Sequence, residues 1–112
     1  MNNYYEFTKE TTSIFYNLKP LPIQQMLDFD FLCDRKPSVS AIVHPGRKGI
    51  HKAFFGKKEI LIPIYDTINE AIEKNEEAKE AEVLINFASF RSAYLSSKEA
   101  LQQHSIKCIV IV

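Results

Sequence analysis

The segment SIFYNLKPLPIQQMLDFDFLC, residues 13–33, decides the fold because it joins a strand to a helix with almost no loop between them. Its first six residues are rich in β-branched and aromatic side chains and predict a short buried strand at 13–18. Two prolines stop this strand, and the second, Pro22, fits the first turn of a helix, where no amide bond is lost. Apolar residues then recur near helical spacing as far as Leu32, and Pro37 ends the helical region.

Further apolar runs follow along the chain and predict strands at 39–44, 60–65, 83–88 and 107–112. Between them the sequence predicts a helix capped by Asp66 or Thr67 and another capped by Ser89. The residues from 46 to 58 are rich in lysine and glycine and predict a loop. The strands are continuously apolar rather than alternating, which is typical of a parallel sheet covered on both faces.

The sequence therefore predicts an α/β fold with a Rossmann-like, doubly wound and mostly parallel sheet of five strands in the order 3-2-1-4-5, flanked by helices. Residues 1–12 are expected to form a polar leader and residues 13–112 the domain. Ligands of such sheets bind beyond the carboxyl ends of the strands. The last predicted strand runs to Val112, so we expect the chain to be a fragment cut at a strand end, or a chain whose remainder is missing.

Composition sets broad limits on function. The 112 residues carry 14 basic and 14 acidic side chains, with 46% hydrophobic residues, which is typical of one globular domain. Zero net charge argues against a dedicated nucleic-acid binder. The sequence has no apolar run long enough for a membrane span, and its start does not resemble a signal peptide. Two cysteines are too few for a disulfide scaffold, so a reduced, cytoplasmic location is expected.

Three segments should meet at the carboxyl edge of the sheet, namely 19–23, 44–56 and 86–92. The first occupies the place of the glycine-rich turn of dinucleotide-binding proteins but contains no glycine. Because those glycines let the backbone approach a pyrophosphate, ordinary NAD binding is not expected.

The segment NFASFRS, residues 86–92, runs from a strand end into a helix start. Ser89 and Ser92 place hydroxyls where free amides and the helix dipole favour an anion, and Arg91 adds a planar fork suited to phosphate. Phe87 and Phe90 offer flat surfaces for a base or an acyl chain. An alternative stays open, in which Ser89 only caps the helix, Phe87 packs in the core and Arg91 pairs with a surface acid.

Basic residues gather in the middle of the chain. Seven of the fourteen lie in a stretch without acids: Arg35, Lys36, Arg47, Lys48, Lys52, Lys57 and Lys58. This stretch predicts either a phosphate-attracting loop or a solvated surface. The histidines, His44, His51 and His104, share no spacing, so no metal site is predicted. Cys33 and Cys108 are expected to be buried.

The stretches QMLDFDFLC (25–33), PSV (37–39), KEILIP (58–63) and LINFASFRSAY (84–94) resemble ATP-citrate lyase, also called ATP-citrate synthase. They are most similar to its CoA-binding domain, which is related to the α subunit of succinyl-CoA synthetase. The resemblance covers residues 12–112. It implies an enzyme that makes acetyl-CoA and oxaloacetate from citrate, CoA and ATP, with Mg and ATP bound by other modules. It also implies a cytoplasmic homo-oligomer whose remaining domains or subunits are the partners of this chain.

The resemblance also assigns site residues, all of them for CoA and none for catalysis. By position, Ser89, Arg91 and Ser92 match a stretch that contacts CoA, with Arg91 on a phosphate, and residues 19–23 match a bordering loop. Ser38 lies near a CoA-contacting position where the synthetases usually have lysine. Phe54 or Phe55 is a candidate to flank the adenine. The predicted CoA-binding set is Lys19, Pro20, Leu21, Ser38, Phe87, Ala88, Ser89, Phe90, Arg91 and Ser92.

Two other interpretations of the chain stay open. It could be a freestanding CoA-binding regulator without catalytic partners, or an assembly module that binds no ligand. Titration with CoA distinguishes the second of these from the other readings.

Overall fold

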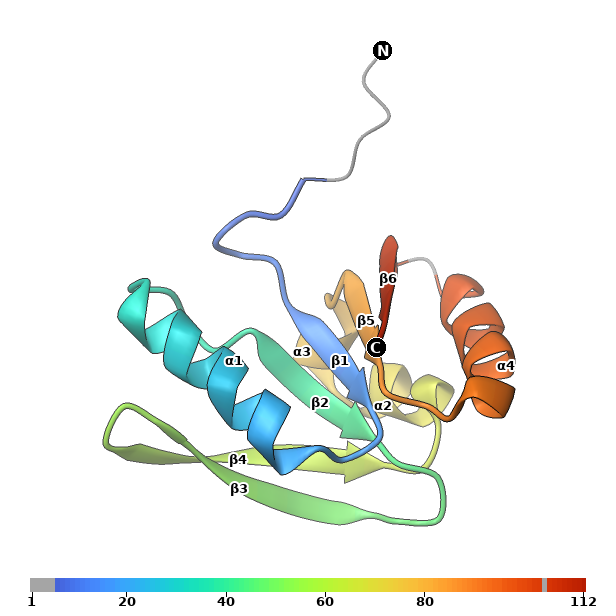
Figure 1. Ribbon diagram of the computed structural model, residues 1–112, viewed down its shortest axis with the longest axis horizontal. Coiled ribbons are helices and arrows are strands. Elements are labelled where there is room, and N and C mark those ends of the chain that lie inside the picture. The colour runs from blue at the N-terminus through green and yellow to red at the C-terminus, as the bar shows by residue number, and fades with distance from the viewer. Residues whose placement is uncertain (1–5, 104) are drawn as a thin grey trace.

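The computed structural model describes residues 6–103 and 105–112. Within them the chain forms an α/β domain, shown in Figure 1. Its elements are β1 Ser13–Tyr16, α1 Pro20–Leu32, β2 Val39–Val43, β3 Gly49–Phe55, β4 Lys58–Tyr65, α2 Ile68–Lys74, α3 Glu76–Lys79, β5 Val83–Asn86, α4 Phe90–Leu101 and β6 Cys108–Ile111. No helix of the described residues is long and apolar enough to cross a membrane.

The described strands form one mixed sheet in the order β3-β4-β2-β1-β5-β6. From β4 to β6 every neighbouring pair is parallel, which confirms the predicted 3-2-1-4-5 order of the five parallel strands. The prediction of a loop over 46–58 is wrong. That segment contains β3, which pairs antiparallel with β4 and adds a sixth strand at the edge.

The β3–β4 hairpin turns at Gly56. Two features of this position, its backbone conformation and a close neighbour, disfavour a side chain. Its φ is +64°, in the left-handed region, and a Cβ there would lie 2.4 Å from the ring of Phe31. Phe31, on the last turn of α1, packs edge-to-face on Phe55 with ring centroids 5.3 Å apart. The hairpin is therefore held against the end of α1.

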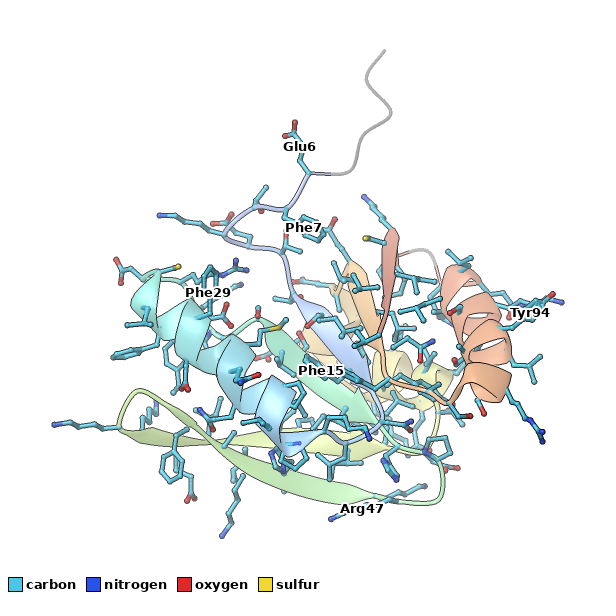
Figure 2. All side chains as sticks on the ribbon, in the orientation of Figure 1. Glu6, Phe7, Phe15, Phe29, Arg47 and Tyr94 are labelled. Atoms are coloured by element: carbon cyan, nitrogen blue, oxygen red, sulfur yellow. The ribbon has the colours of Figure 1, made fainter. Side chains whose placement is uncertain are left out.

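Helices cover both faces of the sheet (Figure 1). On one face α1 contributes Ile23 and Leu27 to a core cluster that includes Phe15 of β1, and Figure 2 shows Phe15 in the middle of the molecule. On the other face α2, α3 and α4 pack on Ile14 and Leu84. The sheet is therefore buried on both faces, as its continuously apolar strands predicted.

A buried polar cluster fastens the end of α1 to the start of β2. Asp30 is 1% exposed, and its Oδ2 accepts hydrogen bonds from the backbone amide (2.8 Å) and the hydroxyl (2.6 Å) of Ser38. Arg35 lies with its Nε 3.2 Å from Asp30 Oδ1, and it also donates to the carbonyl of Thr11 at 3.0 Å. We call Asp30, Arg35 and Ser38 the amino-edge cluster, because β2 begins beside it.

Candidate functional site

Three loops meet at the carboxyl edge of the central strands β2, β1 and β5. The chain leaves β1 toward α1 on one face of the sheet and leaves β5 toward α4 on the other face (Figure 1). This divergence makes the gap between β1 and β5 the switch point of the sheet, where α/β proteins generally bind their ligands. We call this region the carboxyl edge.

The β1–α1 loop presents one positive charge and few amides. Lys19 precedes the first residue of α1 and is exposed, as are Pro20 and Leu21. The prolines at 20 and 22 have no N–H, so this helix start offers fewer donors to an anion than an ordinary one. The contribution of this loop to anion binding therefore rests mainly on the ammonium group of Lys19.

The β5–α4 turn is shaped by Asn86, which is fully buried at the end of β5. Its Oδ1 accepts from the amide of Ala88 at 2.8 Å, and its Nδ2 donates to the hydroxyls of Ser96 (2.8 Å) and Ser97 (3.1 Å) in α4. The sequence analysis did not predict this role. A polar residue at the end of an otherwise apolar strand was the available signal.

Exposed polar side chains follow this turn. Ser89, Arg91 and Ser92 are all exposed, and the hydroxyls of Ser89 and Ser92 lie 3.1 Å apart. Ser89 occupies the N-cap position of α4, as predicted, but its side chain makes no capping hydrogen bond, and the amides of Ser92 and Ala93 donate to its backbone carbonyl instead. Among the described residues the side chain of Arg91 makes no ion pair or hydrogen bond. The arrangement leaves two hydroxyls and a guanidinium available to an anion at a helix start.

The neighbouring residues are more buried. Phe87 is half-buried and stacks on Phe15 with ring centroids 5.8 Å apart, so one of its faces is already used by the core. Ala88 is 7% exposed. The side chain of Phe90 lies outside the described part of the structure.

Three of the sequence-predicted residues are not brought to the carboxyl edge. Ser38 directly precedes β2 and is 6% exposed within the amino-edge cluster, at the opposite edge of the sheet. Phe55 packs on the last turn of α1, and Phe54 exchanges backbone hydrogen bonds with the side chain of Gln24. These contacts are structural ones.

The basic stretch is divided between strand, loop and turn. Lys48 pairs with Glu70 at 3.3 Å, and the amide of Gly46 donates to Asp66 at 2.6 Å. Arg47 is exposed on the β2–β3 loop, where Figure 2 labels it. Burial, reinforced by nearby Arg47, lowers the pKa of His51.

Of the other singled-out residues, His44 has a defined role at this edge, since its Nδ1 accepts from the amide of Leu18 at 3.0 Å. His104 lies outside the described residues. Cys108 is partly buried, but Cys33 is exposed, so its predicted burial is wrong.

Tyr16 ends β1 on the face covered by α4. Burial raises the pKa of its hydroxyl, and the carboxylates of Glu99 and Asp66 raise it further. The surroundings of the tyrosine therefore favour the neutral phenol over the phenolate.

Comparisons with known proteins show which proteins this chain resembles. No family model matches the chain. It is 52% identical over 107 residues to an ATP-citrate synthase β chain of Oryza sativa subsp. japonica and 42% identical over 109 residues to the ATP-citrate synthase of Bos taurus. Both alignments cover 95% of this chain. The chain is related to one segment of the ATP-citrate lyases. It spans 17% of the length of the rice relative and 10% of the bovine one.

Solved structures agree with this relationship. The ATP citrate lyase of Methanothrix soehngenii, in complex with citrate and coenzyme A, matches 96% of this chain with a TM-score of 0.88 and 45% identity. A variant of the Methanosaeta concilii ATP citrate lyase, in complex with (3S)-citryl-CoA, matches with a TM-score of 0.87 and 44% identity. Each match covers 17% of the solved chain. The fold of this chain is therefore that of an ATP-citrate lyase segment.

Proposed function

We propose that this chain binds CoA at the carboxyl edge, with its phosphates at the start of α4. The observation that carries the proposal is the exposed set Ser89, Arg91 and Ser92 at the switch point of the sheet. It gains support from a solved relative with coenzyme A that shares 45% of its sequence and this fold. Lys19 contributes a second positive charge across the switch point.

The predicted residues contribute unequally in this proposal. Ser89, Arg91, Ser92 and Lys19 supply polar contacts, and Pro20 and Leu21 supply apolar contact from the opposite loop. Ala88 and Phe87 shape the turn from below rather than offering a free surface. We leave Ser38 out of the site because its hydroxyl is committed to Asp30.

The wider role follows from the relatives. We propose that the chain acts as the CoA-binding part of an ATP-citrate lyase, which converts citrate, CoA and ATP to acetyl-CoA and oxaloacetate. The ATP, the Mg and the catalytic groups are then held by other domains or subunits, and the 112 residues alone catalyse no reaction. A cytoplasmic homo-oligomer is the expected setting.

Calorimetric titration of the chain with CoA tests the proposal. We expect saturable binding that weakens about tenfold in Arg91→Ala, because hydrogen bonds to charged groups are worth roughly 1.5–3 kcal/mol. Lys98→Ala is the matched control, since Lys98 is an exposed cation in the last turn of the same helix. Absence of saturable binding to the wild-type chain would contradict the proposal, as would equal losses in the two variants.

Dephospho-CoA, which lacks the 3′-phosphate, shows which phosphate Arg91 holds. If it holds the 3′-phosphate, Arg91→Ala should lose its preference for CoA over dephospho-CoA. If it holds the diphosphate, both ligands should weaken together.

A further inference from the structure

The end of β1 has an unusual backbone conformation. Asn17, the residue after β1, has a φ of +77°. Among the described residues the other non-glycine with positive φ is Asp34, at +56° in the turn after α1. A positive φ is uncommon outside glycine, although asparagine and aspartate tolerate it better than other residues. We therefore expect the Asn17 side chain to make an interaction that a glycine at this position could not make.

The hydrogen bonds of Asn17 supply that interaction. Its backbone amide donates to the carbonyl of Val43 in β2 at 2.7 Å, and its side-chain Nδ2 donates to the carbonyl of Phe87 after β5 at 3.1 Å. The residue thus links the two strands that flank β1, directly at the switch point. The next amide, that of Leu18, donates to His44 Nδ1.

These bonds connect the two loops of the proposed CoA site. Phe87 lies two residues before Ser89 and four before Arg91, and Asn17 lies two residues before Lys19. The Asn17–Phe87 bond is the one side-chain hydrogen bond between the two loops in the described structure. It joins residues that are 70 positions apart in the sequence. A shift of either loop along the edge would break this hydrogen bond.

We propose that Asn17 is a positioning residue that sets the spacing between the β1–α1 loop and the β5–α4 turn, and through it the placement of Arg91. This inference rests on the proposed CoA site. Asn17 is half-buried and needs no contact with the ligand, since it acts through the carbonyl of Phe87. With this left-handed backbone conformation the Asn17 side chain reaches the carbonyl of Phe87, after β5. A glycine with the same φ would lack this hydrogen-bond donor.

The test uses Asn17→Gly, which accepts the backbone conformation but removes the Nδ2 donor. Asp34→Gly is the matched control, because it makes the same kind of change at the other positive φ, in an exposed turn away from the carboxyl edge. We expect Asn17→Gly to weaken CoA binding by up to about fivefold, because the net free energy of one hydrogen bond, about 1 kcal/mol, limits how strongly this bond can bias the placement of Arg91, and a cooperative unfolding transition should be retained. Asp34→Gly should bind CoA like the wild type.

Asn17→Asp and a double-mutant cycle complete the experiment. Asn17→Asp keeps the size and the backbone tolerance, but an ionised carboxylate cannot donate to a carbonyl, so it should weaken CoA binding at least as much as Asn17→Gly. Because Asn17 acts through the loop that holds Arg91, its loss should matter less once Arg91 is alanine, so the double variant should bind more tightly than two independent losses predict.

The outcomes separate the inference from the proposed function. If the wild-type chain binds no CoA, the proposed site fails and the inference fails with it. If the wild type binds but Asn17→Gly binds equally well, the inference alone is overturned. Strictly multiplicative losses in the double variant would also overturn it, because Asn17 would then act independently of Arg91.

Discussion

The two edges of the central sheet use polar side chains in opposite ways. At the amino edge, Asp30 accepts hydrogen bonds from Ser38 and forms an ion pair with Arg35, and Asp30 and Ser38 are nearly fully buried. At the carboxyl edge, Ser89, Arg91 and Ser92 are exposed. Two asparagines next to them make the hydrogen bonds instead: Asn86 donates to the hydroxyls of Ser96 and Ser97, and Asn17 donates to the carbonyl of Phe87. Buried polar groups must be paired, whereas exposed ones can exchange water for a ligand.

The difference teaches how to separate fold from function among motifs that resemble the same family. Ser38 and Ser89 both belong to stretches that resemble the ATP-citrate lyases, and both were predicted to contact CoA. Ser38 has its hydroxyl 2.6 Å from a buried carboxylate, whereas within the described structure the hydroxyl of Ser89 bonds to the exposed hydroxyl of Ser92. In the proposed function Ser38 therefore contributes to stability and Ser89 to binding.

Asp30→Ala should show the largest effect. It leaves the amide and hydroxyl of Ser38 without their acceptor and the guanidinium of Arg35 without its counter-ion. Breaking a buried pair by removing one partner typically costs about 3–5 kcal/mol. We expect a loss of this size in the free energy of unfolding, measured by urea denaturation.

The control is Asp34→Asn, which removes an exposed negative charge four residues further along and keeps a side chain that tolerates the positive φ at this position. It should leave the free energy of unfolding far closer to that of the wild type. A loss below about 1 kcal/mol for Asp30→Ala would show that the amino-edge cluster does not stabilise the fold.

Ser38→Ala should have an intermediate effect. It tests most directly whether Ser38 stabilises the amino-edge cluster or contributes to the CoA site. It removes one hydrogen bond to a carboxylate while keeping the backbone bond, so we expect a loss of about 1.5–3 kcal/mol in the free energy of unfolding. The affinity of the folded chain for CoA should not change. A weaker affinity at unchanged stability would instead return Ser38 to the CoA site.

Much of the fold could be predicted from the sequence, since the continuously apolar strands and short connections fixed the order of the five parallel strands. The strand β3 was missed because it lies at an edge and is covered on one face. Its exposed positions, such as Lys52 and Phe54, alternate with the buried Ala53, and the segment 46–58 that contains it is rich in lysine and glycine. The glycine at 56, between Phe55 and two lysines, was the signal for a hairpin turn.

The site could be predicted in part, because a strand end followed by a helix start places Ser89, Arg91 and Ser92 from local sequence alone. Ser38 could not be placed in this way, since its partner Asp30 lies in a different element. A signal was present, however: Asp30 continues the helical stripe of Ile23 and Leu27, and an acid in a buried stripe indicates a polar partner. Asn17 carried no such signal, because its role depends on a carbonyl 70 residues away.

Tyr16 provides the smallest effect and asks whether a group at the carboxyl edge also contributes to stability. The fold raises the pKa of Tyr16 above its ordinary value of 10.0, through burial first and then through Glu99 and Asp66. Both the folded and the unfolded chain hold the proton well below that pH. As the pH rises past about 10, the unfolded chain ionises first, so the free energy of unfolding should fall. Tyr16→Phe should reduce this fall, measured by urea denaturation between about pH 8 and about pH 10.5.

Tyr94→Phe is the matched control, because Tyr94 is 64% exposed on the outer side of α4 (Figure 2) and should leave the wild-type slope in place. Identical slopes for Tyr16→Phe and the wild type would mean that the carboxyl edge does not favour the neutral tyrosine. The division of labour between the two edges would then be sharper than the structure indicates, with the titrating group at the carboxyl edge contributing nothing to stability.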